Sequence, residues 1–485
     1  MPVPDYEVVI GLEVHAQLLT RSKIFCGCST AFGAAPNAHV CPVCLALPGA
    51  LPVLNRQVVE LAVRTGLALG CVVQPRSVFA RKNYFYPDLP KGYQISQYEA
   101  PICLGGEVAF DLDGAARRVR LTRIHMEEDA GKNLHEVAVD GGSGVDLNRA
   151  GVPLVEIVSE PDLRSAEEAV EYLKALRAVL VWLEVNDGNL EEGSFRCDAN
   201  VSVRRRGAAR YGTRVEIKNM NSFRFLRQAI DFEVRRQVEV VDGGGEIVQE
   251  TRLFDPDRGE TRSIRSKEEA QDYRYFPEPD LPPVLVDEPL LARARAALPE
   301  LPRPRAARYQ RDLGLSPYDA GLLVGDRALA DYFDRALAAA GGGPERAKKV
   351  ANWIIGELSR LMNETGRGPA DWKVTPAALA EVVRLVEAGA VSGAGAKQVV
   401  EALFREGGDP GAVIALRGLA QLSDAGAIEA AVDRVLAASP AEVERHRSGK
   451  KDLTGFFVGQ VMKALGAAGN PGVVRALLQK KLGGG

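Results

Sequence analysis

Apolar and polar residues alternate along several short segments of the first 290 residues, as they do in β-strands that bury one face. Strands are predicted in YEVVIGLEVHAQL, RRVRLTRIHM, GVPLVEIVSEPD, DANVSVRRR and TRVEIKNM. Turns rich in Gly, Asn and Asp separate these segments, which favours antiparallel pairing over βαβ repeats. One helix is predicted from Ser165, with Glu168 completing a capping box, and another after Ser222. This part of the chain therefore has an α+β pattern.

Helical patterns replace the strands in the rest of the chain. A Pro-rich segment closes the α+β region near residue 290, and Ala- and Leu-rich segments follow it. The segment REGGDPG at 405–411 marks a second boundary. We therefore expect three domains: an α+β domain over residues 1–290, a helical domain over 291–408 and a helical tail over 409–485.

Composition and charge are those of an ordinary soluble globular protein. The 485 residues are 46% hydrophobic and 26% charged, and the net charge is -3. A chain without a global basic excess can bind nucleic acid only through local patches. The N-terminus shows no signal-peptide pattern, and no uninterrupted apolar stretch reaches about 18 residues. We expect a cytoplasmic protein with no membrane contact.

Four predicted strands carry acidic side chains where apolar ones are normally buried. Alternation along a strand places Glu13 and His15 on one face, and Asp198 and Asn200 on one face of another strand. It places His125, Glu127 and Asp129 together, with Glu128 on the opposite face. Glu156 lies among aliphatic residues. A buried carboxylate costs several kcal/mol unless it is paired or binds a cation. A shared Mg²⁺ site for phosphate chemistry is therefore favoured. The alternative is the solvent face of a half-exposed antiparallel sheet, with His15 as a structural histidine.

Four of the seven cysteines form two closely spaced pairs. They are Cys26, Cys28, Cys41 and Cys44, with twelve residues between the pairs, and Gly27 and Pro42 supply the tight turns. Four thiolates fill the tetrahedral coordination of zinc and leave no open position, so a structural zinc knuckle is predicted. The alternative is four buried or free thiols.

Loops between the acidic strands are rich in Lys, Asn and Tyr. Lys82 and Lys91 are suited to neutralise a phosphate, while Asn83 and Tyr84 offer hydrogen bonds and a flat surface. A packed loop explains this composition equally well. Further on, Lys218 is spaced to pair with Glu216, and Asn219 extends a polar run suited to line a pocket. No P-loop or dinucleotide-binding glycine motif occurs, so any ATP would bind on a sheet.

Long irregular motifs spread over the whole chain resemble a known family, the B subunit of the tRNA-dependent amidotransferase, a heterotrimer often written GatCAB. The resemblance is carried by the cysteine quartet and by IGLEVHAQL, RKNYFYPDLPKGYQISQY, HMEEDAGK, DLNRAGVPLVEIVSEPD, EEGSFRCDANVS, VEIKNMNSF, ETRLFD and DYRYFPEPDLPP. The segment GFFVGQVMKALGAAGNPGVV is similar to the tail module of YqeY-type proteins.

The resemblance implies a fold and an activity. The fold is an antiparallel cradle similar to glutamine synthetase and guanido kinases, followed by a helical domain and a helical YqeY-like tail. The activity is ATP- and Mg²⁺-dependent phosphorylation of the side-chain carboxylate of Glu-tRNA(Gln) or Asp-tRNA(Asn). Ammonia then converts the acyl phosphate to the amide.

Site residues follow from this implied chemistry. The expected metal ligands are Glu13, His15, Glu127, Glu128 and Glu156; the expected ATP or substrate contacts are Lys82, Asn83, Tyr84, Lys91, Lys218 and Asn219. Glu128, Asp198 and Glu216 are further catalytic candidates, the last two for metal contact or for accepting a proton from ammonia. The expected tRNA contacts in the tail are Arg445, Arg447, Lys450, Lys451 and Lys463.

The resemblance also implies partners. An amidase A subunit would supply ammonia through an internal channel, and a small C subunit would wrap around both. The RNA partner is tRNA(Gln) or tRNA(Asn), together with a non-discriminating synthetase. Two other functions remain open: a non-catalytic, zinc-containing tRNA-binding scaffold, and a stand-alone ligase resembling glutamine synthetase, which the long helical half disfavours.

Overall fold

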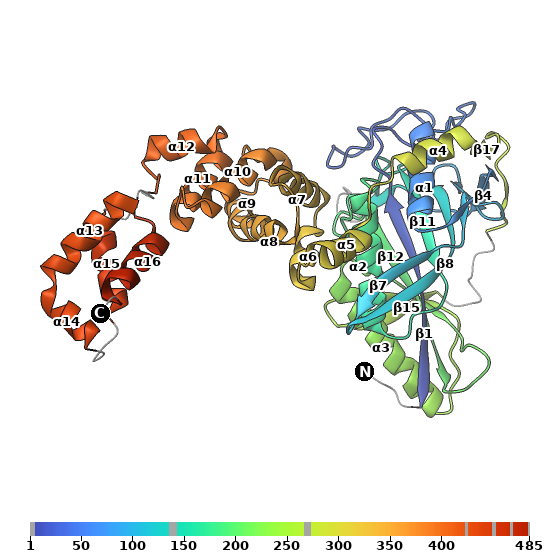
Figure 1. Cartoon of the computed structure of the whole chain (residues 1–485). Coiled ribbons are helices and arrows are strands. Elements are labelled where there is room, and N and C mark those ends of the chain that lie inside the picture. The colour runs from blue at the N-terminus through green and yellow to red at the C-terminus, as the bar shows by residue number, and fades with distance from the viewer. Residues whose placement is uncertain are drawn as a thin grey trace. The chain divides into compact units, whose positions relative to one another are not determined.

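The chain forms two compact units, Met1–Leu301 and Pro302–Gly485, drawn in Figure 1 from a computed structural model. The structure describes residues 5–134, 143–265, 273–421, 425–448, 453–465 and 469–483. Within these ranges, no helix is both long enough and apolar enough to span a membrane. The division into three domains stays a prediction.

A large sheet forms the centre of the N-terminal unit. Its described strands lie in the order β15-β14-β13-β12-β1-β11-β8-β6-β2, with β7 paired to β8. Their bounds are β1 Tyr6–Gln17, β2 Val72–Val73, β6 Cys103–Leu104, β7 Glu107–Leu112, β8 Ala115–Glu128, β11 Pro153–Ser159, β12 Phe195–Arg205, β13 Val215–Lys218, β14 Thr251–Asp255 and β15 Glu260–Arg265. The five strands predicted from sequence are β1, β8, β11, β12 and β13, and all are confirmed.

The prediction of a fully antiparallel sheet is wrong for one pair of strands. β13 and β14 run parallel, so the sheet is mixed. The helix α3, Phe223–Asp242, lies between them in sequence and supplies the long crossover that a parallel pair requires. The likeness to the glutamine synthetase cradle stays a prediction.

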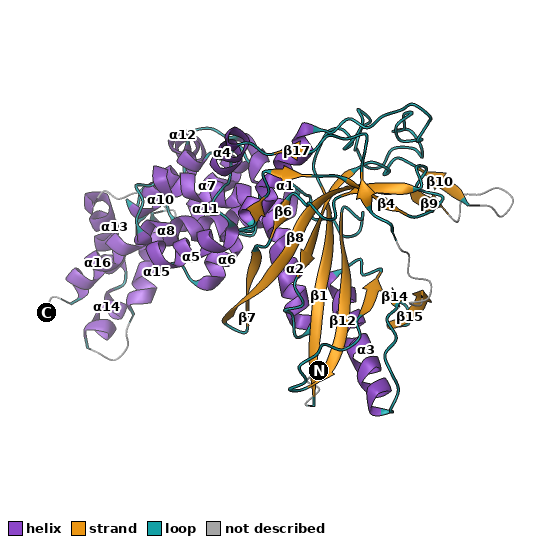
Figure 2. Cartoon of the chain, turned by 90° about the vertical axis from the view of Figure 1, so that its right-hand side faces the viewer, coloured by secondary structure: helices purple, strands orange, loops and turns teal. Residues whose placement is uncertain are grey.

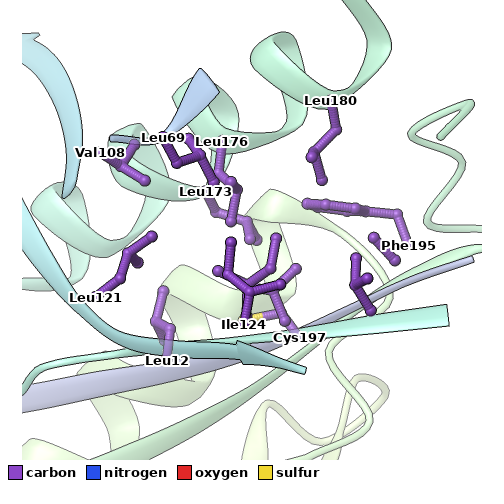
Figure 3. Close-up of a cluster of buried hydrophobic side chains, with 14 of the residues drawn as sticks. Leu12, Leu69, Val108, Leu121, Ile124, Leu173, Leu176, Leu180, Phe195 and Cys197 are labelled. Atoms are coloured by element: carbon purple, nitrogen blue, oxygen red, sulfur yellow. The ribbon is translucent and has the colours of Figure 1, made fainter. Parts of the chain in front are cut away.

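One face of the sheet is apolar and lies under helices. Leu12, Ile124 and Cys197 point to this face and pack with Leu173 and Leu176 of α2, Ala166–Trp182 (Figure 3). Figure 2 shows α2 and α3 beside β1 and β12. Because side chains alternate along a strand, the residues between these apolar ones face the opposite side.

Both predicted helix starts are confirmed in the structure. Ser165 Oγ accepts a hydrogen bond from the Glu168 N–H at 3.1 Å, and Ser222 Oγ accepts one from the Phe225 N–H at 3.1 Å. The Glu168 carboxylate accepts from the Arg164 N–H at 2.8 Å, one residue before the cap. The capping box is therefore displaced by one residue.

Shorter elements surround the sheet of the N-terminal unit. Two helices, α1 (Arg56–Ala68) and α4 (Glu288–Ala296), pack against each other. The small strands are β3 Arg76–Ser77, β4 Ala80–Asn83, β5 Tyr93–Ser96, β9 Lys132–Leu134, β10 Gly144–Asp146, β16 Phe276–Pro277 and β17 Val284–Leu285. β5 adjoins β8, so the Lys- and Tyr-rich loop lies next to the acidic end of β8.

In its described residues, the C-terminal unit is built of helices joined by short loops. Its helices are α5 Pro302–Leu313, α6 Pro317–Leu323, α7 Arg327–Ala339, α8 Pro344–Asn352, a π-helix Trp353–Leu358, α9 Ser359–Thr365, a 3-10 turn Pro369–Asp371, α10 Pro376–Glu387, α11 Gly393–Glu406, α12 Pro410–Arg417, α13 Ala425–Ala438, α14 Pro440–Arg447, α15 Thr454–Ala464 and α16 Pro471–Leu482. Their buried apolar residues form one cluster from Tyr309 to Ile414 and another from Ile428 to Leu482.

Candidate functional site

Glu156 lies between two histidines at the centre of the sheet's polar face. In the strand register, His15 of β1 and His125 of β8 are both paired with Glu156 of β11. Glu156 Oε2 is 3.3 Å from His15 Nε2 and 3.2 Å from His125 Nε2. The structure therefore confirms that His15 of β1 and His125 of β8 lie on the polar face, and β11 places the Glu156 carboxylate on that face as well.

The imidazoles counteract the cost of burying Glu156. Burial alone would raise the pKa of Glu156, but the adjacent His125 and His15 hold that pKa well below its usual range. Burial lowers the pKa of His15, and Glu156 more than offsets this, so the pKa of His15 is raised overall. The group is an electrostatic unit that keeps a carboxylate charged inside the protein.

Glu127 lies two residues after His125 on the same face and is 1% exposed. The Lys82 ammonium lies 3.5 Å from Glu127 Oε1, an ion-pair distance. That oxygen is buried and accepts no hydrogen bond from any residue in the described ranges. Burial opposes the charge on Lys82, yet Glu127 and Glu156 raise the pKa of Lys82 well above its usual value.

These residues fit a divalent cation. One ligand atom from each of His15, Glu127 and Glu156 can be chosen so that all three lie within 4.8 Å of one another. In octahedral Mg²⁺ coordination, adjacent ligand atoms are about 3.0 Å apart and opposite ones about 4.2 Å apart. The three ligand atoms would therefore have to draw closer around the ion, and the Glu127 oxygen that accepts no hydrogen bond would gain a ligand role. The two carboxylates suit both Mg²⁺ and Mn²⁺, whereas an imidazole nitrogen is a more usual ligand of softer metals.

Glu13 lies on the same face, beside this metal-ligand cluster. Its Oε1 accepts a hydrogen bond from Asn200 Nδ2 at 2.9 Å, and its strand partner is Asp198. Burial raises the pKa of Glu13, and the carboxylates of Glu156, Glu216 and Asp198 add to this effect. A bound cation would relieve this repulsion.

Glu128 is not brought to the cluster. Consecutive residues of a strand point to opposite faces, so Glu127 faces the cluster and Glu128 faces away. The Glu128 carboxylate forms an ion pair with Lys91 and accepts the Ile95 N–H at 2.8 Å. The structure thus places Lys91 and Glu128 together, away from the expected metal ligands, and both line a small void of about 20 Å³.

Asp129, on the same side as Glu127, is held by two arginines. Arg196 Nη2 lies 3.0 Å from Asp129 Oδ2, and Arg149 Nε lies 3.7 Å from Oδ1. Burial would raise the pKa of Asp129, but these guanidinium groups lower it overall. Neither arginine is among the site residues predicted from the sequence. The signal for Arg196 is its spacing of two from Asp198, because that spacing puts both on one face.

Lys218 confirms the predicted pairing with Glu216 and adds a second acid. Its Nζ lies 2.6 Å from Asp198 Oδ2 and 3.0 Å from Glu216 Oε1. Burial works against its charge, whereas Asp198 and Glu216 raise the pKa of Lys218 overall. Thr251 of the parallel strand β14 donates to Glu216 Oε2 at 2.8 Å.

A cavity of about 450 Å³ collects many of the predicted residues. His15, Lys82, Tyr84, Glu127, Asp198, Lys218 and Asn219 line it, together with Asp129, Arg149 and Arg196. Asn83 has a different role, since its side chain donates to the carbonyls of Tyr273 and Arg274. Tyr84 donates to Gln94 at 3.0 Å, and Asn219 donates to the Phe254 carbonyl at 3.0 Å.

The four predicted zinc ligands lie together. Cys44 Sγ is 3.7 Å from Cys26, 3.8 Å from Cys41 and 3.9 Å from Cys28. Zinc–sulfur bonds of 2.3 Å in a tetrahedron separate the sulfurs by about 3.8 Å, so the quartet fits zinc. No described cysteine forms a disulfide, and all four remain free thiols able to bind the metal.

A buried lysine next to the quartet supports this assignment. Lys23 is 0% exposed, and its ammonium donates to the His39 and Leu147 carbonyls and to Cys44 Sγ at 3.4 Å. A hydrogen bond from Cys26 lowers the pKa of Cys44 to about 4, against the effect of burial, and Lys23 acts in the same direction. A buried ammonium needs a compensating anion, and a zinc-bound thiolate supplies one.

The basic tail residues are partly described. Arg445 and Arg447 lie on α14 and Lys463 lies at the end of α15, and all three are exposed. Arg447 donates to the Lys481 carbonyl at 3.1 Å. Lys450 and Lys451 lie outside the described residues. The predicted tRNA contact thus stays a prediction.

Comparison with known families matches nearly the whole chain. A family described as the GatB/GatE catalytic domain matches residues 8–292, and one described as the GatB domain, named for YqeY, matches residues 331–482. The first match covers the large sheet with its acidic face and the cysteine quartet. The second covers most of the helical unit.

Curated relatives are similar over their full length. The chain is 74% identical over 483 residues to the B subunit of aspartyl/glutamyl-tRNA(Asn/Gln) amidotransferase from Anaeromyxobacter sp. (strain K), with 100% of both chains covered. The protein of the same name from Myxococcus xanthus is 60% identical over 483 residues, again with 100% coverage. That from Geobacter sulfurreducens is 56% identical over 482 residues, with 99% of this chain and 100% of the relative covered.

The zinc assignment is tested by Cys41→Ser. We expect this variant to lose most of its bound zinc and to melt at a lower temperature, because metal binding at such a site stabilises the fold. Elemental analysis and a thermal melt of the purified chain measure both effects. Cys71→Ala, which removes a buried thiol outside the quartet, is the control and should keep its zinc. Zinc-free native protein with an intact fold would contradict the assignment.

Proposed function

Because the chain belongs to the family formed by the B subunit of aspartyl/glutamyl-tRNA(Asn/Gln) amidotransferase, we propose that its sheet activates the substrate of the amidation. A carboxylate oxygen of the glutamyl or aspartyl group on tRNA attacks the γ-phosphorus of ATP, and ADP leaves. Ammonia then attacks the acyl carbon, phosphate leaves, and the amide forms. The products are Gln-tRNA(Gln) or Asn-tRNA(Asn). The charged tRNA substrates would place the activity in the cytoplasm.

One observation carries this proposal: a buried carboxylate oxygen without a hydrogen-bond partner faces a cavity lined by cations. Glu127 Oε1 is that oxygen, and Lys82 lies 3.5 Å from it. A purely structural ion-pair network normally satisfies its buried oxygens. An unsatisfied one beside Glu156 and His15 is what a divalent cation and its nucleotide would complete.

We propose that His15, Glu127 and Glu156 hold Mg²⁺ or Mn²⁺, with Glu13 beside them. When bound, the ion supplies positive charge that neutralises phosphate oxygens as the phosphoryl group moves. His125 contacts Glu156 from the side opposite His15, so it fixes the carboxylate without needing to bind the metal itself.

The cations of the cavity bind the reacting groups. Lys82 and Lys218 have pKa values above the usual range and therefore keep their charge at neutral pH. We assign Lys82 to the transferred phosphoryl group because it faces Glu127. Lys218 stands between Asp198 and Glu216, and we assign Asp198 as the acceptor of the proton that ammonia loses when the C–N bond forms.

Ammonia comes from another subunit in this proposal. Making it from glutamine requires an activated nucleophile, and Cys197 does not supply one. Burial raises the pKa of Cys197 well above its usual value, and the side chain lies in the apolar core. We therefore propose an amidase A subunit as the source, an internal channel as the route, and a small C subunit as the third partner.

The helical tail is proposed as the tRNA-binding element. Arg445, Arg447 and Lys463 are exposed on neighbouring helices of one apolar cluster. Exposed Lys and Arg side chains bind phosphates by displacing counterions, and this requires no sequence-specific contact. When the tail binds tRNA, the polar face of the sheet is free to act on the aminoacyl end.

The metal-ligand cluster is tested by Glu127→Gln and Glu156→Gln. Each keeps the shape of the side chain and removes its charge, so ATP-dependent amidation of charged tRNA should fall at least about 100-fold. The assay uses the chain co-expressed with its A and C partners. Glutamine hydrolysis by the A subunit should persist in part.

Glu171→Gln is the matched control for these variants. Glu171 lies on α2 and pairs with Lys174 at 2.8 Å on the helix surface, so amidation should stay near the wild-type rate. Near-normal amidation by both Glu127→Gln and Glu156→Gln would contradict the catalytic assignment. It would favour a tRNA-binding scaffold in which the acids only form ion pairs.

The tail is tested by the double variant Arg445→Glu with Lys463→Glu. We expect tRNA affinity to fall about tenfold or more and its dependence on salt to flatten, because phosphate contacts are lost. Binding titrations at several salt concentrations measure both effects. The control is Arg405→Glu on α11, which changes an exposed arginine outside the tail. Unchanged affinity and salt slope in the double variant would exclude these two residues as contacts.

A further inference from the structure

The loop that joins the two cysteine pairs, residues 29–40, lies at the surface of the N-terminal unit. None of its residues is buried, and residues 31–40 form neither helix nor strand. A segment with so little buried surface has a low local stability unless its ends are fixed. The four cysteine sulfurs converge, so a zinc ion bound to them ties the two ends of this loop together.

Asn37 joins this loop to residues 145–149, here called the Arg149 segment. Its Nδ2 donates to the Val145 carbonyl at 2.9 Å, and its Oδ1 accepts from the Leu147 N–H at 2.8 Å. Its own N–H donates to Asp146 Oδ1 at 2.9 Å. The φ of Asn37 is 61°, a left-handed backbone that asparagine tolerates better than most residues. This conformation directs the side-chain amide at the Arg149 segment.

Asn148 forms the return contacts. Its Oδ1 accepts from the His39 N–H at 2.8 Å, and its Nδ2 donates to the Ala35 carbonyl at 2.7 Å. The buried ammonium of Lys23 donates to the carbonyls of both His39 and Leu147 and so bridges the two chain segments. The loop and the Arg149 segment are therefore held together almost entirely by polar contacts.

The Arg149 segment depends on such support. It begins in β10, which pairs with β9 in a two-stranded sheet separate from the large sheet. Two strands alone are marginally stable in water. The hydrogen bonds from the loop therefore stabilise a part of the chain that lies outside the large sheet.

Arg149 and Ala130 line the cavity of about 450 Å³ at the metal-ligand cluster, here called the site cavity. Arg149 Nε donates to the Ala130 carbonyl at 2.9 Å, and its Nη2 donates to the Gly131 carbonyl at 2.6 Å. The backbone is packed tightly there, because a Cβ added to Gly131 would lie 2.9 Å from the carbonyl oxygens of Asp146 and Asp88. The Arg149 side chain stays 34% exposed, so its charge can contact a ligand in the site cavity.

We propose that Asn37 and Asn148 are positioning residues for the amidation: through them the zinc-bound loop holds Arg149 in the wall of the site cavity, where Arg149 orients the carboxylate of the aminoacyl group. This inference rests on the proposed function, because that function makes this carboxylate the nucleophile. A guanidinium binds a carboxylate in a planar, directional way, so a displaced Arg149 would leave the attacking oxygen poorly aligned. Loss of the loop contacts should therefore slow the reaction more than it weakens tRNA binding.

Asn37→Gly removes the side-chain contacts and still permits the left-handed backbone. In the complex with the A and C partners, kcat for amidation should fall about tenfold, while KM for charged tRNA should change less than about twofold. Asn148→Ala should have the same effect. Zinc content and glutamine hydrolysis by the A subunit should stay at the wild-type level in both variants.

Ala38→Gly is the matched control for these variants. It adds a glycine to the same exposed loop and removes no side-chain hydrogen bond. Its kcat and its KM should therefore equal those of the wild type.

A double-mutant cycle tests whether Asn37 acts through Arg149. Arg149→Ala should lower kcat at least about tenfold. Adding Asn37→Gly to it should cause no further loss, because the side chain that Asn37 positions is already gone. A general loss of folding would instead add to the effect of Arg149→Ala.

Hydrogen exchange of the complex supplies a readout that does not depend on activity. The Leu147 N–H is the probe, because its acceptor Asn37 lies on the loop that the cysteines close. Removal of zinc with a chelator should speed its exchange at least about tenfold, while the amides of β1 keep their rates.

The outcomes separate this inference from the proposed function. It is overturned by losses that add in the double variant, or by a wild-type kcat in both Asn37→Gly and Asn148→Ala. A Leu147 N–H that exchanges equally fast with and without zinc also overturns it. The variants Glu127→Gln and Glu156→Gln, assayed in parallel, judge the proposed function. Their loss of amidation beside normal Asn37→Gly leaves that function in place, and near-normal amidation by all of these variants overturns both proposals.

Discussion

The rest of the site depends on one buried carboxylate, that of Glu156, held between two imidazoles in a sheet with an apolar opposite face. Its charge is tolerated because His15 and His125 lie at 3.3 and 3.2 Å on either side. The same strand pairing that aligns these three side chains also brings Glu127 and Asp198 to the polar face. Opposite charges that pair across neighbouring strands therefore allow these ionised side chains to be buried on the polar face.

Two of the acids, Glu127 and Glu13, are not fully compensated, and they indicate the chemistry of the site. Asp129 is fully engaged by arginines, and Lys218 is shared by two acids. Glu127 retains an oxygen without a hydrogen bond, and neighbouring carboxylates raise the pKa of Glu13. A site in which one buried acid lacks a hydrogen bond and another is crowded by carboxylates, with Lys82 and Lys218 close by, is suited to bind a cation together with a phosphate.

Alternation along strands made much of the site predictable from sequence. The spacing of two between Glu13 and His15, and between Asp198 and Asn200, places each pair on one face, as the structure confirms. The same rule separates Glu127 from Glu128, whose carboxylate pairs with Lys91 instead. Which strands are neighbours is set by long-range pairing, so neither the contact of Glu156 with both histidines nor the ion pair of Arg196 with Asp129 could be read from local spacing. The parallel pair β13 and β14 was missed for the same reason.

The central claim is that the acids bind a divalent cation that is distinct from the zinc of the cysteine quartet. Anomalous diffraction from a crystal of the full-length chain grown with Mn²⁺, recorded at the manganese and zinc edges, tests this directly. The account predicts one manganese peak within coordination distance of His15, Glu127 and Glu156 and one zinc peak among Cys26, Cys28, Cys41 and Cys44. Zinc in the quartet with no manganese at the acids would contradict it.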